Sequence, residues 1–425
     1  RNTIAFELGY LSTLDWTPKS EFAEVYINGE YNGTYNVSEK VEEKSARVDI
    51  GSDGFLLEKD TNVQDRVDPD DVYFNTSAYQ NENIIVIKEP GIDRIDANDF
   101  AFEQDSRFIY IRNHINAFEE ALFGDDFKDP VIGYPSYIDV DSFIDWFLIN
   151  EISKNVDARQ FSSIYFTHIP GEKIKMGPLW DFDLGFGNMN YGDPQFAEGW
   201  HVRYHAWISR LLDDPVFVTQ VQDRFTDHYL ANKQYILNKI DEQAELLKWA
   251  QHENFNKWQI LGVPVWPNPY VWDTYEEEVL YLKTWYEDRM DWLEVAINSL
   301  AGESEGPVTT PDNVSVTFQV DMNSVETNTE GVYLAGGNLG QDGYLMSDNG
   351  NDVWSVTIEL SPNSRYLYKF RNQPSYVTWE GFESGEGLAV GDCSTGEWSD
   401  RFIDVGDSDI VLNVVAYGSC TSQPY

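Results

Sequence analysis

Three aspartates at short spacing carry the strongest chemical signal in this sequence: Asp157, Asp181 and Asp183. Asp157 stands just after a stretch with helical apolar spacing, and the other two follow it beyond a hairpin pattern. Alternate residues of an extended segment share a face, so Asp181 and Asp183 can point together at one Mg²⁺ or Mn²⁺, hard cations that prefer oxygen ligands. With a further carboxylate to orient an attacking hydroxyl, this is the set that phosphoryl transfer needs.

A close pair of aspartates is by itself a weak signal in this chain. The sequence has 73 acidic and 29 basic residues among 425, with a formal net charge of −44. Charge runs are most often solvated surface, so the pair needs support from its surroundings. The negative charge does argue against nucleic acid or an anionic membrane as a partner, because both require a cationic footprint. No apolar run approaches the ~18 residues of a membrane-spanning helix.

The elements that must position these aspartates begin with a β-rich lobe. Residues 21–60 alternate apolar and polar side chains in short runs. Asn28-Gly29 between two such runs predicts a tight hairpin, because Asn-Gly readily adopts positive φ angles. Segments 54–57 and 84–88 are predicted as further strands.

Helices and a second hairpin are predicted around the aspartates themselves. Apolar spacing predicts helices over 102–123 and 142–154, and a hairpin turning at Pro170-Gly171 comes directly before the second aspartate pair. Residues 205–300 are predicted to be helical, with one buried apolar stripe near the end of that stretch. The first part of the chain is therefore expected to be an α+β domain.

A change of composition marks a domain boundary after residue 300. Glycine, proline and small polar residues predict a linker over 301–312. From residue 313 onward short strands recur at intervals typical of a β-sandwich. The sequence thus predicts domains at 1–300 and 313–425, the second a small all-β sandwich.

Ten short segments of the sequence stand in an order and spacing that resemble one known family. They are Arg1-Asn2, 24–35, 38–40, 47–50, 54–58, 88–90, 150–151, 155–157, 177–183 and 186–188. Through them, the sequence over residues 1–230 resembles the CotH (spore coat protein H-like) family of atypical protein kinases. The Gly-Pro-Leu-Trp-Asp-Phe-Asp element at 177–183 is the most specific of them, and its Asp-Phe-Asp is similar to the Asp-Phe-Gly of kinases. The resemblance implies a secreted or surface-exposed kinase fold that uses ATP and Mg²⁺ or Mn²⁺ to phosphorylate Ser or Thr of partner proteins.

Carried over by position, the resemblance gives each candidate residue a role. Asp157 is similar to the catalytic aspartate, and Asp181 and Asp183 to the metal ligands. Lys88 and Glu39 become candidates for the nucleotide pocket. The alternative interpretations remain open, namely that Lys88 is a solvent-exposed lysine at the end of a strand and Glu39 an ordinary surface carboxylate.

Two departures from the kinase pattern stand out. Ser162 occupies the position, five residues after Asp157, where kinases place a metal-binding asparagine. The resemblance also implies a basic, Arg-Gly-Asn-rich segment upstream of residue 1, so the first domain is expected to be missing its N-terminal part.

The second domain offers two further predictions. It resembles the sandwich modules of secreted Bacteroidetes proteins, some of them starch-binding-like, and its aromatic residues are either core or a stacking surface for a glycan. The aromatic candidates are Tyr344, Trp354, Tyr376 and Trp379. Cys393 and Cys420 are predicted to form one disulfide of an exported domain, with two unpaired cysteines as the alternative.

Two functions from different classes follow. The first is an extracellular or cell-surface kinase that phosphorylates Ser or Thr of a protein substrate. The second is a non-catalytic adhesin or scaffold that keeps the kinase-like fold and binds glycans or proteins. Nucleotide-dependent phosphate transfer separates them.

Overall fold

The chain forms two compact units, Arg1–Ser304 and Glu305–Tyr425. The computed structural model describes all residues except 62–70, 77–83, 93–100, 301–313, 337–338, 340–342, 361–363, 374–380, 385–387, 389–392, 396–398, 406–408 and 421–425. The predicted linker 301–312 lies outside the described residues. Each unit has its own hydrophobic core, so each is described by itself.

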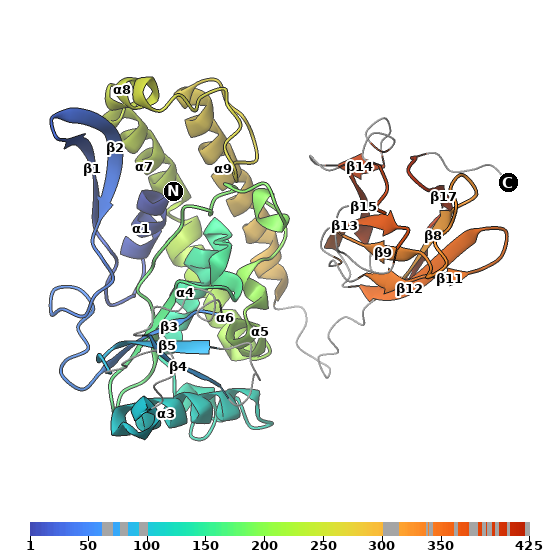
Figure 1. Ribbon diagram of the computed structural model, residues 1–425. Coiled ribbons are helices and arrows are strands. Elements are labelled where there is room, and N and C mark those ends of the chain that lie inside the picture. The colour runs from blue at the N-terminus through green and yellow to red at the C-terminus, as the bar shows by residue number, and fades with distance from the viewer. Residues whose placement is uncertain are drawn as a thin grey trace. The chain divides into compact units, whose positions relative to one another are not determined.

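The first unit mixes strands near its start with helices that dominate its second half (Figure 1). Its strands are β1 (Ser20–Ile27), β2 (Glu30–Ser38), β3 (Phe55–Lys59), β4 (Val72–Asn75), β5 (Ile84–Glu89), β6 (Ile164–His168) and β7 (Lys175–Met176). Its α-helices are α1 (Asn2–Tyr10), α3 (Ser106–Phe123), α4 (Val140–Ser153), α5 (Ala206–Leu211), α6 (Pro215–Arg224), α7 (Lys233–Leu246), α8 (Ala250–Lys257) and α9 (Tyr275–Ser299). Short helical turns are η1 (Ala101–Gln104), η2 (Tyr134–Ser136), η3 (Asp157–Arg159), η4 (Asp193–Gln195), η5 (Val202–Tyr204) and the π-helical η6 (Phe225–Leu230).

A five-stranded antiparallel sheet of this unit has the order β4-β5-β3-β6-β7, and its strands β3, β4 and β5 lie near α3 in Figure 1. Because side chains alternate across a strand, its two faces have different surroundings. One face carries Phe55 and Leu57 into the main core, where α3 covers it through ring contacts such as Phe55 with Tyr110. The other face carries Glu58 between Val86 and Tyr165 of the neighbouring strands.

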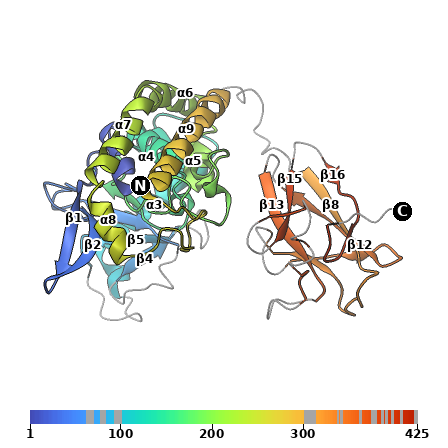
Figure 2. The same ribbon diagram turned by 90° about the horizontal axis from the view of Figure 1, so that it is seen from above.

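Helix α4 is the central helix of the unit. Its residues from Ser142 to Ser153 are all buried, so over this stretch the helix has no solvent-exposed face and is not amphipathic. Asp139 caps its start, and its end turns through Lys154 in a left-handed conformation before η3 begins at Asp157. Helices α7 and α9 run side by side in both views (Figures 1 and 2).

The predicted hairpins and helices near the aspartates are confirmed within a few residues. Asn28 and Gly29 both take positive φ at the β1–β2 turn, and β6 and β7 pair as the second hairpin. The prediction of helix across 205–300 is wrong in one place, because residues 258–274 form a loop between α8 and α9. Pro264, Pro267 and Pro269 lie in that loop, and proline does not continue a helix. Within the described residues, no helix is long and apolar enough to cross a membrane.

The second unit consists of β-sheets. Its strands are β8 (Val314–Asp321), β9 (Tyr333–Ala335), β10 (Tyr344–Leu345), β11 (Ser347–Asp348), β12 (Val353–Leu360), β13 (Ser364–Arg371), β14 (Ser394–Thr395), β15 (Asp400–Val405), β16 (Ile410–Val411) and β17 (Val415–Ala416). One sheet has the order β10-β9-β13-β15-β14, and the other has the order β11-β12-β8-β16 with β17 also pairing β8. Side chains of both sheets, such as Phe318 of β8 and Phe370 of β13, belong to one core.

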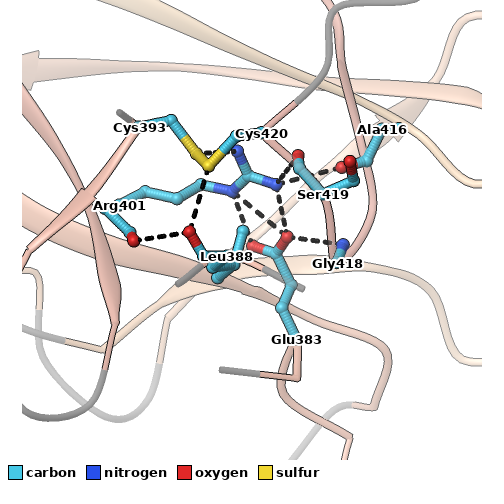
Figure 3. Close-up of a disulfide and its surroundings, with 9 residues drawn as sticks. Glu383, Leu388, Cys393, Arg401, Ala416, Gly418, Ser419 and Cys420 are labelled. Carbon is cyan, nitrogen blue, oxygen red and sulfur yellow. Dashed lines mark hydrogen bonds and ion pairs between the residues drawn. A yellow bond between two sulfur atoms is a disulfide. The ribbon is translucent and has the colours of Figure 1, made fainter. Parts of the chain in front are cut away.

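The predicted disulfide between Cys393 and Cys420 is confirmed, with 5.4 Å between the two Cα atoms (Figure 3). Beside it lies a buried ion pair in which Arg401 Nη2 is 2.6 Å from Glu383 Oε2. Arg401 also donates hydrogen bonds to the backbone oxygens of Ala416 and Ser419, next to Cys420. The disulfide therefore fastens the C-terminal segment to Cys393, just before β14, and the hydrogen bonds of Arg401 fasten the same segment to β15.

Candidate active site

The segment that carries Asp181 and Asp183 is held against α4 and α1. Phe182 is buried, its ring meets Phe6 of α1, and its backbone N–H donates to Asn2 Oδ1 at 2.6 Å. Asp181 takes φ +62°, a region that residues with a Cβ seldom adopt and that recurs at functional sites. The buried phenylalanine thus anchors the segment while the aspartates on either side of it stay accessible to solvent in part.

The structure brings the three predicted aspartates together. Asp181 hydrogen-bonds with Asp183 and with Ser163. Burial raises the pKa of Asp181 to about 6, and the charges of Asp183 and Asp157 add to that rise. Because the charge of Asp157, in η3, acts on Asp181, we group it with this pair. We call Asp157, Asp181 and Asp183 the carboxylate cluster.

Lys88 lies beside a carboxylate that the sequence did not single out. Lys88 Nζ is 3.3 Å from Glu58 Oε2, and alternation along β5 and β3 puts both on the sheet face away from the main core. Burial raises the pKa of Glu58, and the charge of Lys88 opposes that rise. The phenol of Tyr165 lies against Glu58, and Asp181 acts on it as well, so this pair adjoins the carboxylate cluster.

Ser163 links the two halves of this site. Its backbone N–H donates to Glu58 Oε1 at 3.2 Å, and its side chain hydrogen-bonds with Asp181. It takes φ +59°, which turns the chain between η3 and β6. Ser162, the residue in the position of the kinase asparagine, is buried. The serine that contacts the cluster is therefore one residue later than the spacing predicts.

Glu39 lies at the end of β2. Its Oε2 accepts a hydrogen bond from the backbone N–H of Lys19 at 3.0 Å, and its charge acts on Tyr10 of α1. Glu39 thus contacts the β1–β2 and α1 region, whereas Lys88 pairs with Glu58. Within the part of the chain that the structure describes, no hydrogen bond or ion pair joins these two predicted nucleotide-pocket residues.

Arg1 and Asn2 bring the start of α1 to the cluster. Asn2 accepts from the backbone of Phe182, as noted above, and Arg1 lies close to Glu278, Tyr281 and Asp183. Burial lowers the pKa of the Arg1 guanidinium, and these three neighbours counter that effect. The sequence pattern offered one signal for this contact, the Arg1-Asn2 pair at the start of the matching segments.

A buried polar network fixes the loop that follows the cluster. Arg289 of α9 donates to Glu151 Oε1 at 2.6 Å and to the backbone oxygen of Ala197 at 2.7 Å, and both charged side chains are fully buried. Lys154 donates to the backbone oxygens of Phe196 and Glu198. Burial, with the neighbouring Arg289, lowers the pKa of Lys154 to about 7. This clamp ties residues 193–199 to the end of α4, which leads into Asp157.

The residues of the cluster fit a divalent cation. Within the described residues, no group of three or more His, Cys, Asp or Glu side chains is placed to hold a metal ion. Mg²⁺ commonly binds proteins through one or two carboxylates and completes its shell with water and phosphate oxygens. Asp181 and Asp183 supply two carboxylates of that kind, and a cation would relieve the repulsion that raises the pKa of Asp181.

The first unit matches a known protein family. A family model described as "CotH kinase protein" matches residues 1–293. A comparison with curated proteins finds no match. Among solved structures, the "Structure of Hormoconis resinae Glucoamylase" is similar at 15% identity over 38% of this chain and 30% of that chain, with a TM-score of 0.19. The chain thus spans less than a third of that protein, and a similarity at this score carries no argument about fold or function.

Proposed function

The chain belongs to the CotH kinase family, and from that premise we propose that its first unit transfers the γ-phosphate of ATP to a Ser or Thr hydroxyl of a partner protein. The observation that supports this most is the convergence of Asp157, Asp181 and Asp183 beside the Lys88–Glu58 pair. Phosphoryl transfer depends mainly on positioning and on charge stabilisation, and these residues offer both.

Each residue has a role in this proposal. Asp157 orients the acceptor hydroxyl and takes its proton as the hydroxyl oxygen bonds to the γ-phosphorus and the bond to the bridging oxygen of ADP breaks. Lys88, oriented by Glu58, meets the phosphates of the nucleotide. Mg²⁺ or Mn²⁺ held by Asp181 and Asp183 would neutralise phosphate charge. Ser163 holds Asp181 in place through its side chain.

For the second unit we propose a two-sheet sandwich on an extracellular or cell-surface protein. Support comes from the core shared by the two sheets and from the disulfide, because such bridges persist in oxidising compartments. A glycan partner remains a prediction. Tyr344 is exposed and Trp354 is half-buried, whereas Tyr376 and Trp379 lie outside the described residues.

The test measures transfer of labelled phosphate from ATP in the presence of Mg²⁺ or Mn²⁺. The substrates are a mixture of secreted proteins and generic kinase substrates, and the product is acid-stable phosphoserine or phosphothreonine. The kinase proposal expects metal-dependent label that disappears in Asp157→Asn. A wild-type protein that binds no nucleotide and transfers no phosphate with either metal contradicts it and favours the scaffold.

A further inference from the structure

An uncharged loop with many exposed apolar side chains joins α8 to α9. Residues 258–272, here the aromatic loop, contain no Asp, Glu, Lys or Arg, although 24% of the chain is charged. Its exposed large side chains are Trp258, Ile260, Val263, Trp266, Tyr270 and Val271. Trp266 is the most open of them, with 74% of its surface accessible. Such a concentration on an otherwise acidic protein marks a contact surface.

The aromatic loop reaches the carboxylate cluster through Tyr191. The rings of Tyr191 and Trp266 stack with 6.1 Å between centroids and 10° between planes. Tyr191 follows Asp183 by eight residues, and Asn188 between them donates a side-chain hydrogen bond to the backbone oxygen of Asp183 at 2.9 Å. The stacked pair therefore lies on the segment that leads out of the cluster, while the indole of Trp266 remains open to solvent.

The aromatic loop is anchored, so its surface is preformed. Trp258 Nε1 donates to the backbone oxygen of Asn32 in the β1–β2 hairpin at 2.9 Å, and the backbone of Gly262 donates to that of Trp272 at 2.8 Å. The ring of Trp272 lies 5.9 Å from that of Tyr281, whose hydroxyl donates to the backbone oxygen of Gly187. A preformed surface binds without a large ordering cost.

The composition of the aromatic loop selects the chemistry of its partner. The loop has no carboxylate that could pair with a positively charged partner and no basic side chain that could pair with a negatively charged one. Charge complementarity therefore favours an uncharged partner segment. Exposed indole and phenol faces stack on planar side chains, and aromatic-lined surfaces also bind proline-rich segments. A segment placed here would extend toward the hydroxyl that Asp157 orients without contacting the reacting atoms itself.

We propose that the aromatic loop and Tyr191 bind an uncharged segment of the acceptor protein that presents an aromatic or proline side chain to Trp266. The proposal rests on the proposed kinase function and names the acceptor that this site selects. An extended chain advances ~3.3 Å per residue, so a peptide series that moves this side chain one position at a time locates it relative to the phosphorylated Ser or Thr.

Binding is tested first, because it requires no phosphate transfer. Fluorescent Ser peptides carry one Trp or Pro at each of about four positions on either side of the serine, with all-Ala and Arg-containing peptides as references. Trp266→Ala is compared with Trp249→Ala, which removes an equally exposed indole, 76% accessible, just before α8 and outside the aromatic loop. Circular dichroism confirms that each variant folds.

Wild type and Trp249→Ala should bind the aromatic or proline peptides at a preferred position, and Trp266→Ala should bind them about tenfold more weakly. The all-Ala peptide should not distinguish the three proteins. Equal binding by Trp266→Ala and wild type, or a preference for the Arg peptides, overturns the proposal. So does Trp266-dependent binding to neutral phosphatidylcholine vesicles without peptide selectivity, which assigns the aromatic loop to a membrane surface.

Transfer to the same peptides then separates this proposal from the kinase proposal. Trp266→Ala should lower kcat/KM by the same factor, through KM and with kcat unchanged, because the contact is remote from the reacting atoms. If wild type binds the peptides through Trp266 but transfers no phosphate, the aromatic surface stands and the kinase proposal fails. If wild type transfers phosphate and Trp266→Ala selects peptides as wild type does, only the aromatic surface fails.

Discussion

Each unit of the molecule buries an arginine–carboxylate pair, and the two pairs have different surroundings. Arg289 with Glu151 in the first unit and Arg401 with Glu383 in the second are both almost completely buried, at the same 2.6 Å between nitrogen and oxygen. Arg401 fastens a C-terminal segment that a disulfide also holds. Arg289 instead holds the loop next to the carboxylate cluster.

The contrast with the carboxylate cluster separates architecture from chemistry. In the two buried pairs each carboxylate faces an arginine, as buried charges must unless they are neutralised. Asp181, in contrast, is partly buried and faces Asp183 and Asp157, so its ionised form is unfavourable in the folded chain despite its hydrogen bond with Ser163. We infer that the paired charges stabilise the fold and that the facing carboxylates are there for chemistry. Substitutions at these positions should therefore differ in how much stability they remove.

The largest loss of stability is expected for Arg289→Met. Removing one partner of a buried ion pair leaves Glu151 uncompensated, which typically costs about 3–5 kcal/mol. Denaturant unfolding, with hydrogen exchange resolved by peptide, should locate the loss in α9 and residues 193–199. Lys248→Met is the control, because its pair with Glu245 is exposed and should change stability by less than about 1 kcal/mol. Equal effects of the two substitutions would remove the distinction between buried and exposed pairs.

In the second unit, Cys393→Ser with Cys420→Ser should cost about 3 kcal/mol, since the bridge spans 27 residues of sequence. Hydrogen exchange should rise in β15 to β17, while peptides of the first unit keep their protection. A change smaller than about 1 kcal/mol would mean that the Arg401–Glu383 pair alone holds the C-terminal segment.

Buried histidines give the first unit a pH dependence. His168 stacks on His114 with 3.9 Å between centroids, and burial, with the neighbouring His114, lowers its pKa from 6.5 to about 4. The unfolded chain thus takes up a proton near pH 6.5 and the folded chain only near pH 4, so stability is full above pH 6.5 and falls as pH drops toward 4. His168→Phe should remove about 2 kcal/mol of that fall, measured as unfolding free energies at pH 7 and pH 5. His252→Phe, on the exposed face of α8, should leave the fall unchanged.

The smallest loss of stability is expected for Lys88→Met, even though it should abolish activity. Lys88 is partly exposed, and Glu58, although buried, keeps the hydrogen bond from the backbone of Ser163, so the loss should stay below about 2 kcal/mol. Phosphate transfer should fall at least about 100-fold if Lys88 meets the nucleotide. A loss of more than about 2 kcal/mol with transfer retained would make this pair structural, like those of Arg289 and Arg401.

Much of this fold could be predicted from local pattern. The Asn28-Gly29 turn, the span of α4 and the close approach of Asp181 and Asp183 depend on neighbouring residues, and neighbours are what a sequence pattern records. The prediction that Asp157 belongs to the same site came from the family resemblance instead, and η3 carries this residue to the cluster.

What the sequence did not predict depends on contacts between distant residues. Glu151 and Arg289 are 138 positions apart, and nothing local distinguishes either from a surface charge. Glu58 has the same difficulty, because its role follows from the pairing of β3 with β5. The loop at 258–274 did have a local signal in its prolines, which the acidic and apolar helical pattern on both sides of it obscured.

The most direct test of the account substitutes one carboxylate of the cluster and measures stability and transfer on the same protein. Asp181→Asn should abolish metal-dependent phosphate transfer and, without added metal at pH 7.5, leave the melting temperature unchanged or raised, because it removes a repelled charge. Asp125→Asn, at an exposed position, should change neither quantity. A marked fall in melting temperature with transfer retained would make Asp181 a structural residue and contradict the central claim.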